Sequence, residues 1–187
     1  MNAPSELKAK KFTVATCSLG GCFGCHMSFL DIDERIVPLI DLIDFDRSPF
    51  TDVKHCSPVV DIGLIEGGLC NTDNVEVLRE FRDSCKILVA VGACAIMGGI
   101  PALRNRFTVE ECLHESYVEG LGISGGTVPN DPEIPLLLNK VRPIHEVVHI
   151  DYVLPGCPPP GDAFWELLTA LIEGREPKLD YALRRFD

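Results

Sequence analysis

Four runs of apolar, often β-branched residues are spaced along the chain, and they are hydrophobic almost throughout rather than alternating with polar residues. They span residues 12–16, 59–65, 87–91 and 147–154. Short continuous runs of this kind are typical of strands that are buried on both faces of a parallel sheet. We therefore predict a parallel sheet that contains these four segments.

Segments with the periodicity of amphipathic helices lie between the predicted strands. Helices are predicted over residues 27–30, 33–43, 71–84, 134–141 and 161–174. We expect an interruption of the second of these at Pro38, and a cap of the third at Asn71 or Thr72. Thr108 and Glu111 have the spacing of a capping box, which predicts the start of a further helix.

The glycine-rich residues 119–130 carry little pattern and are predicted to form an irregular loop. Outside this loop, strands and helices alternate at roughly the spacing of βαβ units. This alternation predicts a single α/β domain over residues 1–187, with a flavodoxin-like, doubly wound parallel sheet.

Four cysteines stand shortly after three of the predicted strands. Cys22 and Cys25 form a Cys-x-x-Cys pair after the first strand, Cys94 follows the third, and Cys157 follows the fourth. Loops that leave the carboxyl ends of parallel strands meet at one edge of an open sheet, where ligands bind. The sequence therefore predicts four thiolates around one point, which indicates a metal or iron–sulfur site.

Three kinds of chemistry are compatible with these thiols. A redox-active dithiol would use only Cys22 and Cys25. A structural zinc ion takes four thiolates but usually links small modules through paired knuckles, whereas Cys94 and Cys157 come singly from separate strands. Glycines beside the cysteines let backbone amides approach sulfide and thiolate, and the Cys157-Pro158 pair is typical of ferredoxin ligands. A 4Fe–4S cluster is therefore the favoured occupant.

Other residues at the same edge are candidates for a role in this site. Cys17 belongs to the loop of the Cys-x-x-Cys pair, and Glu66 ends a predicted strand before two glycines. Glu66 is a candidate for proton movement or partner contact, beside the simpler interpretation as a hydrogen-bonded loop residue. The histidines, including His26 next to Cys25, lack ligand spacing and are interpreted as structural or surface residues. Residues 18–21 stand where a flavodoxin binds the flavin phosphate, but the surrounding cysteines disfavour a flavin there.

Charge and hydropathy argue against nucleic acid and membrane as binding partners. The formal net charge is −11 and no long Lys/Arg cluster is present, which argues against nucleic-acid binding. No apolar run is long enough for a transmembrane helix, and the amino terminus lacks the apolar core of a secretion signal. We therefore expect a cytoplasmic protein with no membrane association, whose nine cysteines, an odd number, stay reduced.

With these motifs in place, the chain resembles the small subunit of nickel–iron hydrogenases, in the short form found in NAD-reducing soluble hydrogenases. The resemblance runs over nearly the whole length. Its distinctive segments are residues 22–30, 66–74, 92–101, 138–146 and 155–160. A related subunit of respiratory complex I carries adjacent tandem cysteines, which this sequence lacks.

The resemblance implies a flavodoxin-like fold that carries the 4Fe–4S cluster proximal to a nickel–iron centre, with Cys22, Cys25, Cys94 and Cys157 as its ligands. The nickel–iron centre would belong to a hydrogenase large subunit. Electrons from dihydrogen would leave for a diaphorase with FMN, further clusters and a ferredoxin-like domain, which reduces NAD.

The small subunits of the larger hydrogenases continue into a domain with ligands for two more clusters. Because no Cys or His follows Cys157 here, we expect this chain to hold a single cluster. Two alternatives remain: a subunit of a related hydrogenase that uses NADP or another acceptor, and a zinc-bound interaction module without redox activity.

Overall fold

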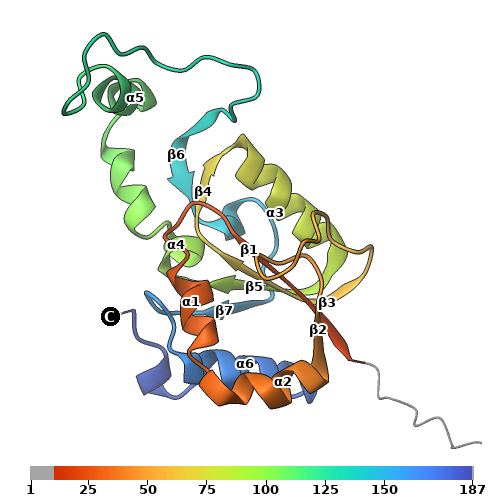
Figure 1. Ribbon diagram of the computed structural model, residues 1–187. Coiled ribbons are helices and arrows are strands. Elements are labelled where there is room, and N and C mark those ends of the chain that lie inside the picture. Colours follow the sequence, from red (N-terminus) through yellow and green to blue (C-terminus); the bar gives the residue numbers. More distant parts are fainter. Residues whose placement is uncertain (1–10, 187) are drawn as a thin grey trace, which may run out of the picture.

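The computed structural model describes residues 11–186, and a five-stranded sheet lies at the centre of this part of the chain (Figure 1). Its strands are β1 (Phe12–Ser18), β2 (Ile43–Phe45), β3 (Val60–Glu66), β5 (Cys85–Val91) and β7 (Tyr152–Leu154). All neighbours are parallel, in the order β2-β1-β3-β5-β7. This is the strand order of flavodoxin-like folds, whose ligand crevice lies at the carboxyl ends of the strands.

Helices cover both faces of this sheet (Figure 1). The helices on one face are α1 (Gly24–Leu30), α2 (Ile36–Leu42) and α6 (Gly161–Ile172), and those on the other are α3 (Thr72–Ser84) and α4 (Gly92–Met97). Short 3-10 helices are η1 (Asp33–Arg35), η2 (Ile100–Arg106), η3 (Ile144–Glu146) and η4 (Tyr181–Leu183). The alternation of faces is the doubly wound arrangement predicted from the sequence.

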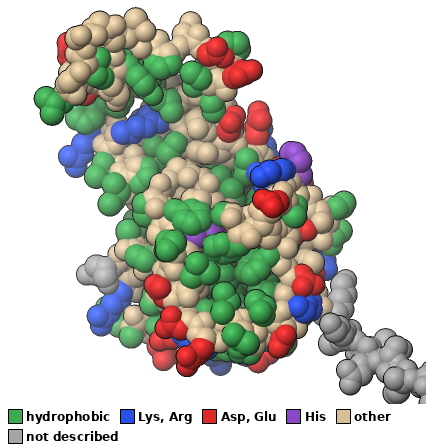
Figure 2. Space-filling view, viewed as in Figure 1, with side chains coloured by type: hydrophobic (Ala, Val, Ile, Leu, Met, Phe, Trp, Pro, Cys, Tyr) green, Lys and Arg blue, Asp and Glu red, His purple; other side chains and the backbone are tan. Residues whose placement is uncertain are grey.

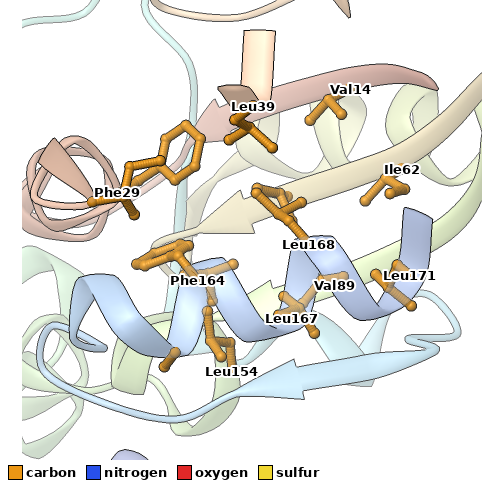
Figure 3. Close-up of a cluster of buried hydrophobic side chains, with 14 of the residues drawn as sticks. Val14, Phe29, Leu39, Ile62, Val89, Leu154, Phe164, Leu167, Leu168 and Leu171 are labelled. Carbon is orange, nitrogen blue, oxygen red and sulfur yellow. The ribbon is translucent and has the colours of Figure 1, made fainter. Parts of the chain in front are cut away.

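The core on the α6 side is built from helix side chains that lie against the apolar faces of the strands (Figure 3). Phe164 of α6 is 2% exposed, and its ring centroid lies 5.4 Å from that of Phe29 on α1. The other labelled members of this cluster are Val14, Leu39, Ile62, Val89, Leu154, Leu167, Leu168 and Leu171. Phe164 thus joins α1, which carries one of the site cysteines, to the main core.

Phe164→Ala is expected to lower the free energy of unfolding by about 3–5 kcal/mol, because it removes a buried ring and leaves a cavity between α6 and α1. Chemical denaturation followed by circular dichroism measures the change. Phe107→Ala is a matched control, since that ring is 59% exposed and its loss should cost less than about 1 kcal/mol. Equal losses for the two variants would contradict this description of the core.

Most of the predicted elements are confirmed. The strands at residues 12–16, 59–65 and 87–91 are β1, β3 and β5, each displaced or extended by one or two residues. Asn71 caps α3 by accepting the backbone N–H of Asn74. The capping box of Thr108 and Glu111 is present at the start of α5 (Val109–Tyr117). The helix predicted over residues 161–174 is α6.

The short helix predicted over residues 134–141 is wrong. The chain there forms β6 (Leu137–Arg142), which pairs antiparallel with β4 (Leu69–Asn71) in a separate two-stranded sheet. A short apolar run does not distinguish a strand from a helix by periodicity, and here the partner strand decides. The irregular loop over residues 119–130 is confirmed, and with α5 it extends away from the central sheet (Figure 1).

Two other predictions need correction. Only Tyr152–Leu154 of the predicted strand over residues 147–154 joins the sheet, because the chain first bonds to β5 at Asp151, whose N–H donates to Leu88 O at 2.9 Å. Pro38 does not interrupt the helical segment. It is the third residue of α2 and lies in the first turn, where the missing N–H of proline costs little because it has no partner within the helix. The interruption of the predicted helix lies before Pro38, where the chain forms the 3-10 helix η1.

No helix among the described residues is both long and apolar enough to span a bilayer.

Candidate functional site

The four cysteines singled out in the sequence lie at the carboxyl edge of the sheet. Cys22 precedes α1 and Cys25 is the second residue of that helix, in the connection that leaves β1. Cys94 is the third residue of α4, which follows β5 directly, and Cys157 lies three residues after β7. β1 and β7 are separated by β3 and β5 in the sheet, so their loops must fold over the edge to meet.

Hydrogen bonds between the loops hold them together at this edge. The backbone N–H of Ala93 donates to Gly156 O at 2.8 Å, which ties the residue before Cys94 to the residue before Cys157. The Ser28 hydroxyl on α1 donates to Pro159 O at 2.5 Å. Each of the three cysteine-bearing segments is therefore bonded to another of them.

Gly92 lets the segments approach closely. It has a φ of 79°, and a Cβ added to it would lie 2.5 Å from Cys25 Sγ. A left-handed backbone and a contact that leaves no room for a Cβ both require glycine here. Cys25 Sγ also lies 4.0 Å from Val91 O. The Cys25 thiol is thus seated against the end of β5, immediately before α4, which carries Cys94.

The electrostatics of the thiols reflect this proximity. Burial raises the pKa of Cys25, and the nearby Glu66, Cys94 and Cys22 raise it further. Burial also raises the pKa of Cys94, and Cys157 is the next largest cause. The neighbouring thiolates therefore make ionisation of Cys25 and of Cys94 harder. Bound metal reverses this, because a coordinating thiol is deprotonated by the charge of the metal.

Glu66 lies beneath these loops, at the end of β3, and is 2% exposed. Its Oε1 accepts the hydroxyl of Ser18 at 2.7 Å, and its Oε2 accepts the backbone N–H of His26 at 2.8 Å. Burial opposes ionisation, but the donors from His26 and Ser18 outweigh it and hold the pKa of Glu66 below its usual value. The interpretation as a hydrogen-bonded residue is confirmed, although the residue is buried rather than part of an open loop.

His26 is buried, at 5% exposure, and belongs to the same network. Its Nε2 lies 3.0 Å from Thr16 Oγ1, and its ring stacks on Phe23 with 4.7 Å between the centroids. Its Nδ1 is 3.1 Å from Glu66 Oε2 but is not aligned for a hydrogen bond. This placement agrees with the interpretation of His26 as a structural residue. The sequence did not predict its contact with Glu66, and the position of His26 next to Cys25 was the only indication of it.

The structure places Cys17 apart from the other four thiols. It is the sixth residue of β1 and packs with the core cluster on the α3 side of the sheet. Burial raises its pKa to about 11, and the nearby Arg47 partly opposes the rise. Cys70 lies behind the loop of the Cys-x-x-Cys pair, where a Cβ added to Gly20 would lie 2.1 Å from its Sγ.

The four converging thiols fit an iron–sulfur group. The donors are all sulfur, and Gly24, Gly92 and Gly99 leave little or no room for a Cβ beside the sulfurs of Cys22, Cys25 and Cys94. Within residues 11–186, no three or more Cys, His, Asp or Glu side chains are placed to hold a single metal ion. Each thiolate of a 4Fe–4S cluster binds a different iron, so its sulfurs do not need to converge on one point as zinc ligands do.

The same edge presents apolar side chains to solvent. Figure 2 shows hydrophobic side chains gathered in the middle of the face that it draws. Met27 on α1 and Met97 on α4 are 57% and 54% exposed, and Ile100 on η2 is 71% exposed. Cys22 and Cys157 are themselves exposed. Apolar surface around an exposed thiol site is typical of a face that another protein covers.

Comparison with known proteins agrees with this description. Residues 22–171 match the model of the family described as NADH ubiquinone oxidoreductase, 20 Kd subunit. The chain is 46% identical over 180 residues to the delta subunit of the NAD-reducing hydrogenase HoxS of Cupriavidus necator, covering 95% of this chain and 86% of that subunit. It is 38% identical over 175 residues to one subunit of the F420-non-reducing hydrogenase of Methanothermobacter thermautotrophicus, covering 91% of this chain and 56% of that protein.

Solved structures show the same relationship. A chain in the crystal structure of an NAD+-reducing [NiFe]-hydrogenase in the H2-reduced state matches with a TM-score of 0.93 and 55% identity, covering 95% of this chain and all of that one. A [NiFeSe]-hydrogenase from Dm. baculatum, at 20% identity and a TM-score of 0.55, shares the fold. The chain therefore belongs to the NADH ubiquinone oxidoreductase 20 Kd subunit family and, within it, is a small subunit of the nickel–iron hydrogenase kind.

Proposed function

We propose that this chain is the electron-transfer small subunit of a cytoplasmic, NAD-reducing nickel–iron hydrogenase. Cys22, Cys25, Cys94 and Cys157 would bind one 4Fe–4S cluster. The observation that carries the proposal is the placement of these four cysteines on hydrogen-bonded segments at one sheet edge, in a chain 46% identical to the delta subunit of an NAD-reducing hydrogenase. The cluster would supply one-electron transfer between hydrogen oxidation in a large subunit and NAD reduction in a diaphorase.

The residues of this chain would shape the site in two ways. Cys25 and Cys94 are partly buried between loops that are hydrogen-bonded to one another, so water has limited access from the side of the sheet. Cys22 and Cys157 are exposed, so the opposite side of the site is open to a partner. This asymmetry suits a cluster that lies between the body of the chain and a docked protein.

The apolar face around Met27, Met97 and Ile100 would bind the large subunit that contains the nickel–iron centre. Long-lived subunit interfaces are usually more apolar than the rest of the surface, and this face has that character. The diaphorase, with FMN, further clusters and a ferredoxin-like domain, would dock elsewhere on the chain. A domain boundary is not required by this proposal, in which residues 1–187 act as one unit.

The proposal is tested by purifying the chain without oxygen together with the proteins that accompany it. We expect the partners to include a nickel-containing large subunit and a flavin-containing diaphorase, and the complex to reduce NAD with dihydrogen. After the diaphorase is removed, hydrogen-driven NAD reduction should fall to background. The large subunit with this chain attached should still reduce an artificial one-electron dye with dihydrogen.

Two outcomes would redirect the proposal. Reduction of NADP in place of NAD would keep the electron-transfer role and change the acceptor. One zinc per chain, with neither iron nor acid-labile sulfide and no visible absorbance that bleaches on reduction, would instead support a zinc-bound interaction module.

A further inference from the structure

Glu66 occupies a central position among the cysteine-bearing loops. It ends β3, the strand between β1 and β5, so it lies between the loop of Cys22 and Cys25 and the loop of Cys94. A cavity of about 10 Å³, room for at most one water, is lined by Glu66, Cys25 and His26 among others. The carboxylate and the Cys25 thiol therefore line the same small cavity.

Both donors to this carboxylate come from the segment that carries the Cys-x-x-Cys pair. Ser18 ends β1, and the backbone N–H of His26 belongs to the first turn of α1. The residue before that helix, Phe23, has a φ of 66° and provides no side-chain cap. Glu66 thus accepts a first-turn N–H that a capping side chain would otherwise accept. Its negative charge also interacts favourably with the positive end of the helix dipole.

A carboxylate buried to this degree needs such partners, because an unpaired charge in a protein interior is costly. The arrangement therefore works in both directions: the loop stabilises the Glu66 charge, and the carboxylate fixes the loop. The backbone of Glu66 contributes as well, since its carbonyl accepts the N–H of Leu19 at 2.9 Å. A side-chain substitution leaves that backbone bond in place and isolates the effect of the carboxylate.

We infer that Glu66 is a positioning residue for Cys25. The carboxylate of Glu66 anchors the first turn of α1 and places a negative charge beside the thiolates of the site. This inference rests on the proposed function, because it concerns the residues that would hold the cluster. Two consequences are separable. The anchoring keeps Cys25 in place, and the charge opposes the addition of an electron nearby, which lowers the reduction potential.

Asp61 offers a matched control on the same strand. It lies at the opposite end of β3, accepts the N–H and the hydroxyl of Thr13, and pairs with Lys86. Asp61→Asn therefore removes a carboxylate that also binds β1, but far from the cysteine loops. Both asparagine and glutamine substitutions keep the side-chain size and remove the charge, so their effects on folding should be similar.

The test uses the full chain, produced without oxygen and loaded with iron and sulfide, in Glu66→Gln, Glu66→Asp and Asp61→Asn forms. Glu66→Gln is expected to shift the one-electron reduction equilibrium of the cluster about tenfold toward the reduced form, ~59 mV more positive. Glu66→Asp keeps the charge but withdraws it from the His26 N–H. It should leave the potential close to that of the native chain and release iron to a chelator several times faster. Asp61→Asn should change neither.

The inference is overturned if the potential of Glu66→Gln equals that of the native chain and both Glu66 variants release iron as slowly as Asp61→Asn. A folded Glu66→Gln chain that holds no cluster supports it, with folding judged by circular dichroism against Asp61→Asn. Should Glu66→Gln fail to fold, chelator release from Glu66→Asp decides, since a rate equal to that of Asp61→Asn overturns the inference. A native chain without iron and sulfide defeats the proposed function itself, before any variant is compared.

Discussion

Replacing Cys22, Cys25, Cys94 or Cys157 by alanine, one at a time, is expected to abolish the intact cluster. The native chain should contain about four irons with matching acid-labile sulfide, and each variant three or fewer. The reason is that every iron of the cluster binds its own protein thiolate, and the four cysteines come from three segments that meet at one edge. Iron and sulfide analysis, with the electron paramagnetic resonance spectrum of the reduced chain, measures the loss.

Cys112→Ala is the control for this series. Cys112 lies on α5, which extends away from the sheet, so its loss should leave iron, sulfide and spectrum unchanged (Figure 1). Full cluster content after one of the four substitutions would remove that cysteine from the ligand set. Cys17 would then be the substitute to examine, although its side chain packs on the α3 side of the sheet.

Gly92→Ala is expected to remove most of the cluster without unfolding the chain. An alanine Cβ at this position would lie 2.5 Å from Cys25 Sγ, where ordinary contact is 3.4–4 Å, so the thiol must move by roughly an ångström. The left-handed backbone adds strain of about 1–2 kcal/mol. We expect iron content to fall severalfold, while the circular dichroism spectrum stays close to that of the native chain.

Gly174→Ala separates these two effects. Gly174 also has a positive φ, 70°, but a Cβ added there meets nothing within 4 Å. Both variants should therefore lose similar stability from backbone strain, and only Gly92→Ala should lose iron. If Gly92→Ala retained the full cluster, Cys25 would not be seated against the end of β5 as described.

The core strands and the four cysteines could be predicted because their patterns are local. An apolar run such as residues 87–91 must be buried on both faces wherever it lies, and a cysteine shortly after it must reach the carboxyl edge. The helix start at Asn71 and the capping box at Thr108 are equally local, since each cap bonds to a residue three positions ahead.

The sequence patterns did not predict the three-residue edge strand β2 or the pairing of β4 with β6. Residues 137–142 carry an ambiguous apolar pattern, and they are a strand because residues 69–71 lie beside them. The same holds at residues 147–154, where three residues pair with β5 and the others pack as irregular backbone. Backbone pairing between distant segments depends on tertiary contacts that no local window contains.

The sequence by itself determined the central strands β1, β3 and β5, the helices α3 and α6, the family resemblance and the cysteines of the candidate site, because these depend on residue type and short-range spacing. Only the tertiary structure decided that Glu66 and His26 lie beneath Cys25, that Gly92 is pressed against its sulfur, and that Cys17 faces the other core. These relations join β1, β3 and β5, which come from separate parts of the sequence, and they follow from strand order and side-chain packing.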